Sequence, residues 1–156
     1  MTQIDIPKDG LTDLEVYEVL TRSKRIAVVG MSRDPQKPAN FVPRYLISKG
    51  YIVLPVNPSA SEILGLRSYR SLLELDTVVD VVDVFRPSEE VPAVAEQALK
   101  IRPRVFWMQE GIYSESAARL LASNGIKVVW NRCMMREHMR LLGQGSRQPR
   151  PAGPIP

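Results

Sequence analysis

The chain has 156 residues, of which 44% are hydrophobic and 24% charged, and a formal net charge of +4, as expected for one soluble globular domain. A single cysteine excludes an internal disulfide framework and fits a reducing compartment, so we expect a cytoplasmic protein. The sequence has no apolar run of about 18 residues, and its first ten residues lack the apolar core of a signal peptide. We therefore expect no association with a membrane.

The first predicted element is a helix that begins at a capping box. Thr12-Asp13-Leu14-Glu15 has the S/T-x-x-E form, in which the first and last side chains bond to each other's backbone N–H groups. Apolar residues then recur on one face as far as Ser23, which predicts a helix that covers the first strand. That strand is predicted over Arg25–Val29.

Strands and helices alternate through the rest of the chain. Further strands are predicted at 51–56, 78–85, 105–108 and 126–130, with a small one near 66–69, and helices at 40–49, 88–100, 115–124 and 134–142, with a helical turn at 71–75. This alternation predicts an α/β fold, a doubly wound parallel sheet of about five strands in the order roughly 3-2-1-4-5. Residues 1–143 form the single domain, and the Pro- and Gly-rich stretch 144–156 is predicted to be a disordered tail.

The turn after the first strand is the strongest candidate for a ligand site. Gly30 follows the strand at once, and a predicted helix begins shortly after, so backbone N–H groups and the positive end of the helix dipole favour a phosphate there. Ser32 adds a hydroxyl, and a Cβ in place of Gly30 would occupy the path of the ligand. The positions of the dinucleotide fingerprint G-x-G-x-x-G read Gly30, Ser32 and Pro35, which predicts a nucleotide-like ligand held differently from NAD.

The ends of the next strands supply further candidate residues, because ligands of doubly wound sheets bind beyond the carboxyl ends of the strands. The second strand ends at Asn57-Pro58, where an NAD enzyme has an acidic residue. A neutral end suits a ribose that already carries a 3′-phosphate, which a carboxylate would repel; NADP stays open. The strand after the connector ends at Phe85-Arg86-Pro87, where a ring can stack on adenine and a guanidinium can reach a phosphate.

The remaining polar residues form no catalytic arrangement. Asp80 and Asp83 lie three apart on a predicted strand, so their side chains point to opposite faces and we interpret them as structural. Cys133 and His138 are nearly half a turn out of phase on a helix, which argues against a dyad, and two ligands are too few for a metal site. We predict no catalytic residue and no metal.

Six segments in order along 25–142 resemble the stand-alone CoA-binding proteins, whose Rossmann-like domain is similar to the N-terminal domain of the succinyl-CoA synthetase α subunit. They read VVGMSRDPQKPANFV, GYIVLPVNP, EILGLRSYRSLLEL, VDVVDVFRPSE, WMQEGIYSE and NRCMMREH. The resemblance implies that the CoA pyrophosphate is held by Gly30, Met31, Ser32 and Arg33, with Lys37 close by. It further implies that Asn57 and Pro58 border the adenosine and its phosphate, that Phe85, Arg86 and Pro87 form the next wall, and that Gln109 and Gly111 face the pantetheine.

Two positions depart from the family pattern. Met31 is bulky where the family usually has a small residue, which predicts a narrower site, and Asn131 stands where the family commonly has an aspartate before Arg-Cys. The phosphohistidine domain of the ligases also has no counterpart among these segments, so we do not expect an acyl-CoA synthetase reaction by this chain alone.

The predicted function is therefore the binding of coenzyme A or an acyl-CoA, in a regulatory or carrier role without catalysis of its own. A homo-oligomer and a complex with an acyltransferase or synthetase partner both stay open. One alternative is an NAD(P)-dependent oxidoreductase, against which Asn57 weighs for NAD. Another is an RNA-binding module that uses the basic C-terminus, but the chain lacks an aromatic and basic strand motif, so no nucleic acid is expected.

Overall fold

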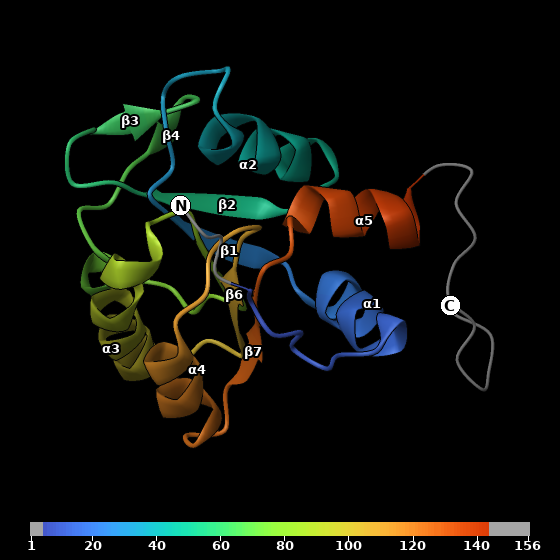
Figure 1. The fold of residues 1–156 in the computed structure, drawn as a ribbon. Helices are drawn as coiled ribbons and strands as arrows, with labels where there is room; N and C mark the ends of the chain where they lie inside the picture. Colours follow the sequence, from blue (N-terminus) through green and yellow to red (C-terminus); the bar gives the residue numbers. More distant parts are fainter. Residues whose placement is uncertain (1–4, 144–156) are drawn as a thin grey trace.

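Five parallel strands form the centre of the computed structural model, which describes residues 5–143 (Figure 1). They are β1 (Arg25–Val29), β2 (Ile52–Val56), β5 (Val81–Val84), β6 (Val105–Met108) and β7 (Lys127–Val129). Side by side they stand in the order β2-β1-β5-β6-β7. Because the chain moves outward from β1 to β2 and then returns to the other side of β1, the order reverses between β1 and β5. The predicted doubly wound α/β fold is confirmed, whereas the predicted tail, 144–156, lies outside the described residues.

The strand order departs from the predicted 3-2-1-4-5, because the third of the five parallel strands, β5, lies between β1 and β6 and not beyond β2. The connector after β2 forms β3 (Glu62–Ile63) and β4 (Leu66–Arg67), which pair with each other as an antiparallel hairpin and not as a strand of the main sheet. Beside β2 the chain makes one isolated parallel bridge, between Val56 and Tyr69. A longer ladder is disfavoured there because Pro55 of β2 has no N–H to donate.

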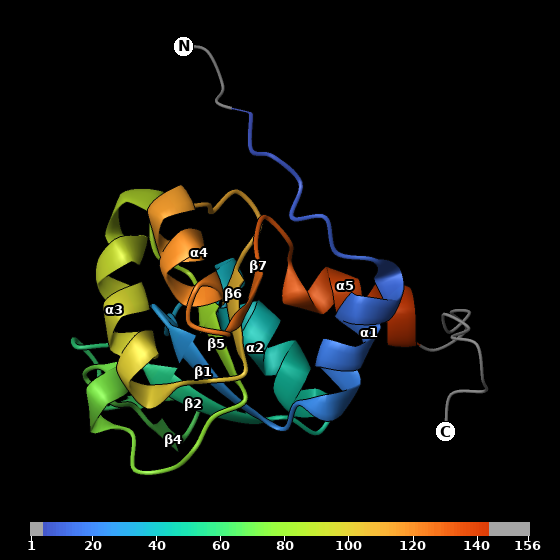
Figure 2. The ribbon, with the colours of Figure 1, turned by 90° about the horizontal axis from the view of Figure 1, so that it is seen from below.

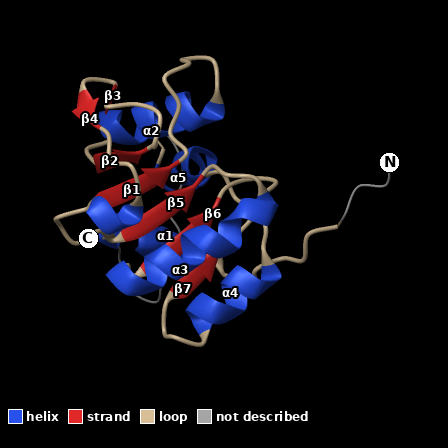
Figure 3. Cartoon of the chain, turned by 90° about the vertical axis from the view of Figure 1, so that its left-hand side faces the viewer, coloured by secondary structure: helices blue, strands red, loops and turns tan. Residues whose placement is uncertain are grey.

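Helices cover both faces of the sheet (Figures 2 and 3). On one face lie α1 (Asp13–Arg22), α2 (Pro38–Ser48) and α5 (Met134–Leu142), and on the other α3 (Val91–Ile101) and α4 (Glu115–Ala122). Alternate strand residues point to the two sides, Ile26 and Val28 to the first and Ala27 and Val29 to the second. Both faces are thus buried, as the nearly continuous apolar strands require. No helix within residues 5–143 is long and apolar enough to cross a membrane.

The local predictions hold for most elements. The capping box is present, since the N–H of Glu15 donates to the side chain of Thr12 and the N–H of Thr12 to the side chain of Glu15. Short 3₁₀ turns lie at Leu72–Glu74 and Ser88–Glu90. The strand predicted at 78–85 is shorter in the structure, where β5 covers only Val81–Val84. Before it, Val78 is 76% exposed, and the carboxylate of Asp80 accepts the N–H groups of Lys24 and Arg25.

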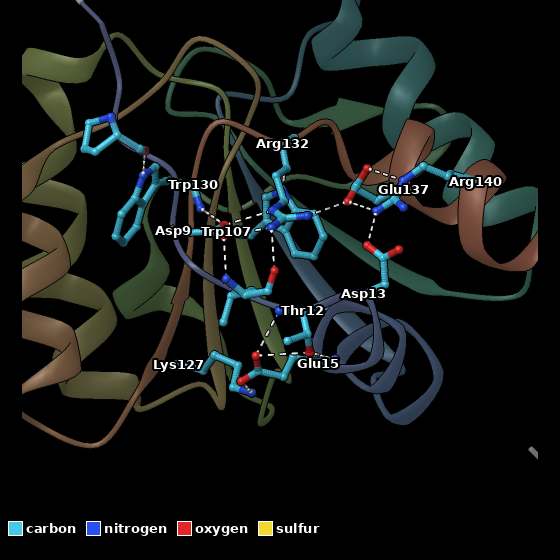
Figure 4. A network of polar contacts seen from close by, with 12 residues as sticks. Asp9, Thr12, Asp13, Glu15, Trp107, Lys127, Trp130, Arg132, Glu137 and Arg140 are labelled. Atoms are coloured by element: carbon cyan, nitrogen blue, oxygen red, sulfur yellow. Dashed lines mark hydrogen bonds and ion pairs between the residues drawn. The ribbon is translucent and has the colours of Figure 1, made fainter. Parts of the chain in front are cut away.

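Arg132 ties the segment before α1 to the connection between β7 and α5 (Figure 4). Its guanidinium donates to the carboxylate of Asp9 over 2.8 and 2.7 Å and to Glu137 over 2.8 Å. The side chain of Asp9 is only 1% exposed and also accepts the N–H of Trp130. Burial alone raises the pKa of Asp9, but the bonds from Arg132 and the backbone outweigh it and hold the pKa below its usual range. The start of α5 is therefore fixed by a buried ion pair.

We expect Arg132→Met to lower the free energy of unfolding by about 3 kcal/mol, because it leaves the buried carboxylate of Asp9 without its cation. The matched control is Arg119→Met, since Arg119 pairs with Glu115 on the surface of α4, where the two side chains are 79% and 60% exposed. That variant is expected to lose less than about 1 kcal/mol. Urea unfolding followed by circular dichroism measures both, and equal losses would contradict the role given to Arg132.

A histidine between two tyrosines joins α2 to α5. The hydroxyl of Tyr45 lies 2.8 Å from Nδ1 of His138, and the rings of Tyr45 and Tyr51 meet the imidazole edge-on. His138 is 8% exposed. Burial, with a smaller contribution from the charge of Lys49, lowers the pKa of His138, so the folded protein favours the neutral ring.

This histidine predicts a loss of stability on the acid side. As the pH falls below about 6.5, the usual pKa of histidine, the unfolded chain takes up a proton that folded His138 resists, and the folded state becomes less stable. Unfolding free energies at about pH 7.5 and about pH 5.5 should therefore differ more in the wild type than in His138→Gln, which keeps a partner for Tyr45. An equal difference in both proteins would show that other groups titrate.

Candidate functional site

The turn after β1 brings Gly30 against the end of β5. The φ of Gly30 is +84°, and a Cβ there would lie 2.7 Å from Cδ of Arg86 and 2.8 Å from the carbonyl oxygen of Phe85. The N–H of Gly30 donates to the carbonyl of Val56 over 2.9 Å. Only glycine combines this backbone conformation with so close an approach. The ends of β1, β2 and β5 consequently meet at one residue.

A proline in α2 helps to hold the turn in place. Pro43 lies in the second turn of the helix and, having no N–H, cannot donate to the carbonyl of Ala39. That carbonyl accepts the N–H of Ser32 over 3.0 Å instead. The side-chain amide of Asn40 donates to the carbonyl of Ser32 over 2.8 Å. The turn is thus bonded to the first turns of the helix through both backbone groups of Ser32.

Asn57, at the end of β2, uses its side chain within the protein. Its amide nitrogen donates to the carbonyl of Met31 over 2.8 Å, and its amide oxygen accepts the N–H of Ser59 over 2.7 Å. Within residues 5–143 the N–H groups of Met31 and Arg33 have no partner. Two N–H groups of the turn, those of Gly30 and Ser32, are already used, so an anion bound here depends on the two that remain.

The expectation that Met31 narrows the site is wrong. Its side chain is fully buried and packs in the core on the side of α1, α2 and α5. Burial stabilises the apolar thioether there, and the residue contributes only backbone to the turn.

Two hollows of about 540 Å³ each lie on either side of Arg86. The first, which we call the β2–α3 hollow, is lined by Gly30, Asn57, Pro58, Ser59, Arg70, Glu90 and Val94, among others. The second, the α2–α5 hollow, is more apolar and is lined by residues that include Lys37, Phe41, Phe85, Pro87, Gln109, Cys133 and Met135. Arg86 lines both hollows, so it is the point at which they adjoin.

Most of the predicted site residues line one of these hollows. Ser32 and the exposed Arg33 belong to the turn and line neither. Gly111 is exposed and also lies outside both hollows. Its N–H donates to the side-chain oxygen of Asn131 over 2.7 Å. Asn131 has a positive φ of 55° and supplies this acceptor from the loop after β7.

Two contacts at the site were not predicted. The guanidinium of Arg86 donates to Glu90 over 3.0 and 2.6 Å, so an anion arriving at Arg86 meets a cation that is already paired. The i,i+4 spacing of these residues is a helical ion-pair signal that could have revealed the pair. The buried side chain of Gln109 accepts the N–H of Met134 over 3.2 Å and so joins the end of β6 to the start of α5.

Within residues 5–143, Cys133, His138 and Asp83 do not come together as one group. Cys133 lines the α2–α5 hollow, whereas His138 bonds to Tyr45, so the two do not form a dyad. Asp83 is fully buried, neither of its oxygens has a partner within residues 5–143, and burial raises its pKa well above the usual range. Burial therefore favours the neutral, protonated form of this carboxyl group. No cluster of three or more possible metal ligands occurs in the described part of the chain.

The chain is similar to known proteins over half or more of its length in several cases. A family model for the CoA binding domain matches residues 24–139. The chain is 42% identical over 124 residues to YneT of Bacillus subtilis (strain 168), an uncharacterized protein, which covers 80% of this chain and 92% of YneT. It is 39% identical to the ADP-forming acetate–CoA ligase II of Archaeoglobus fulgidus over 80 residues, 49% of this chain but 12% of the ligase. A solved structure of a hypothetical protein from Pyrococcus horikoshii OT3 has 44% identity and a TM-score of 0.85, covering 91% of this chain and 100% of the other.

The close approach at Gly30 predicts a stability effect that precedes any effect on a ligand. We expect Gly30→Ala to lower the free energy of unfolding by about 2–4 kcal/mol, from the positive φ and from overlap with the end of β5. Gly50→Ala is the matched control, because Gly50 also has a positive φ but open space where its Cβ would lie. It should lose only about 1–2 kcal/mol. Equal losses in urea unfolding would show that β5 yields to the added methyl group.

Proposed function

Because the chain belongs to the CoA-binding domain family, we propose that it binds coenzyme A or an acyl-CoA at the turn after β1, in a regulatory or carrier role. The observation that carries the proposal is the position of Arg86, which lines both hollows and packs against Gly30. CoA has a nucleotide end and a pantetheine end, joined by a pyrophosphate. A ligand of this shape fills both hollows and sets its charged link beside Arg86.

The turn supplies the groups that a pyrophosphate needs. The free N–H groups of Met31 and Arg33 are donors, and the start of α2 adds the positive end of a helix dipole. The exposed side chains of Arg33 and Lys37 add charge close by. Since Ser32 and Asn57 are held by bonds within the protein, the turn needs little further ordering when the ligand binds.

The α2–α5 hollow suits the pantetheine arm. Apolar side chains, among them Phe41, Phe85 and Met135, form most of its wall, while Gln109 places an amide group at the end of β6. Such a wall with a few polar groups is typical of small-molecule sites. The arm and an attached acyl group would remove this apolar surface from water, which favours binding.

Nothing in the site favours the oxidoreductase alternative. At the end of β2, where NAD enzymes have an acceptor for the ribose hydroxyls, both polar atoms of the Asn57 side chain are already bonded. The similarity to the ligase covers 12% of that protein, so its reaction does not carry over to this chain. A separate synthetase or acyltransferase that exchanges the acyl group with this protein is part of the proposal.

Calorimetric titration with CoA, NAD and NADP tests the proposal, with CoA expected to bind more tightly than either nicotinamide nucleotide.

Arg86→Gln should weaken CoA binding by about ten- to a hundredfold, because a charge-assisted hydrogen bond contributes about 1.5–3 kcal/mol. Glu90→Gln should strengthen it, because Arg86 is then free of its carboxylate partner. Arg44→Gln, an exposed change on α2 that touches neither hollow, is the control. Unchanged affinity in Arg86→Gln would place the pyrophosphate elsewhere.

A further inference from the structure

Arg70 lies beside the end of β2, although it is 14 positions further along the chain than Val56, the last residue of that strand. The isolated bridge between Val56 and Tyr69 brings the two segments together. The N–H of Tyr69 donates to the carbonyl of Pro55 over 2.9 Å, and the N–H of Asn57 donates to the carbonyl of Tyr69 over 2.8 Å. Arg70 is therefore held by backbone bonds at the point where a nucleotide ribose lies in a βαβ site.

The side chain of Arg70 is an uncommitted cation at this point. It is exposed, lines the β2–α3 hollow, and has no side-chain partner within residues 5–143. Arg86, across the same hollow, is paired with Glu90. The carboxylate of Glu74 lies near Arg70 but accepts its backbone N–H over 3.0 Å. The only cation of this hollow that is free of a carboxylate is thus Arg70, among the described residues.

The groups around Arg70 suit a phosphate more than a sugar hydroxyl. Ser59 and Ser71 also line the hollow and offer hydroxyl groups, and no carboxylate ends β2. A third hollow, on the side of the β3–β4 hairpin, is also lined by Arg70 and Ser59, and we call it the hairpin hollow. A group that reaches past the ribose has room there. An arginine in such a place accommodates a phosphate on the ribose, which a carboxylate would repel.

We propose that Arg70 binds the phosphomonoester on the ribose of the bound nucleotide, the 3′-phosphate of CoA, and makes the protein select CoA over dephospho-CoA. This inference rests on the proposed function but concerns a different phosphate from the one assigned to Arg86. The pyrophosphate is common to CoA and dephospho-CoA, whereas the 3′-phosphate is present only in CoA. The two assignments can therefore be tested separately.

Titration of the wild type, Arg70→Gln and Arg70→Lys with CoA and dephospho-CoA tests the inference. We expect the wild type to bind CoA about ten- to a hundredfold more tightly than dephospho-CoA. Arg70→Gln should abolish this preference through weaker binding of CoA, with the affinity for dephospho-CoA unchanged, and Arg70→Lys should keep part of it. Because Arg70 is exposed, the variants should fold, and circular dichroism checks this.

Arg67→Gln is the matched control. Arg67 lies over the ring of Tyr69, 4.6 Å from its centroid, and lines the hairpin hollow but not the β2–α3 hollow. Its substitution should leave the ratio of the two affinities unchanged. If the ratio falls to the same extent as in Arg70→Gln, the phosphate is bound by the charge of the whole hairpin region and the assignment to Arg70 is wrong.

The other outcomes separate this inference from the proposed function. Equal binding of CoA and dephospho-CoA by the wild type would overturn the role of Arg70 while CoA binding stands. Equal weakening of both ligands in Arg70→Gln would also overturn it. Failure to bind either ligand would overturn both proposals. A preference for NADP over NAD that depends on Arg70, without binding of CoA, would show that the phosphate belongs to a nicotinamide nucleotide and would overturn the assignment to CoA.

Discussion

The contact between the turn after β1 and the end of β5 is the constraint on which the candidate site depends. These segments are far apart in the chain, but the parallel sheet sets their ends side by side. They meet so closely at Gly30 that a single added carbon would overlap the carbonyl of Phe85. The same contact fixes where Arg86 leaves the backbone, and with it the place where the two hollows adjoin. The position of Arg86 thus depends on the absence of a side chain at Gly30, just after β1.

The rigidity of the turn comes from groups that other elements leave without partners. Pro43 frees the carbonyl of Ala39, and the turn uses that carbonyl through Ser32. Asn57 bonds to the turn from β2, and Asn40 does so from α2. Each bond is modest on its own, about 1 kcal/mol. Together they hold a short loop in one conformation, so that little conformational entropy remains to be lost on binding.

The sequence predicts where the helices and strands lie better than it predicts which side chains contact one another. The strand 105–108 and the helix 134–142 match their predicted bounds, because apolar runs between turn residues are local signals. Most of the predicted site residues line the two hollows, since the carboxyl ends of parallel strands lie at the same edge of the sheet. The inward direction of the Met31 side chain and the position of Arg70 were not predicted, because both arise only from packing and from a bridge between distant segments. The bond from Gly111 to Asn131 was missed for the same reason, since the two residues lie on different loops.

The two outer strands of the sheet have a consequence for how copies of the chain meet. β2 carries Pro55, which has no N–H, and the segment at Tyr69 lies along its outer side. β7 has three residues and begins with Lys127, and just beyond it Asp9 accepts the N–H of Trp130. Proline, lysine, short length and a covering loop are the features by which natural sheets block pairing with a further strand. Edge-to-edge growth into larger sheets is therefore disfavoured at both sides, and assemblies of this protein would have to form through its helices or loops.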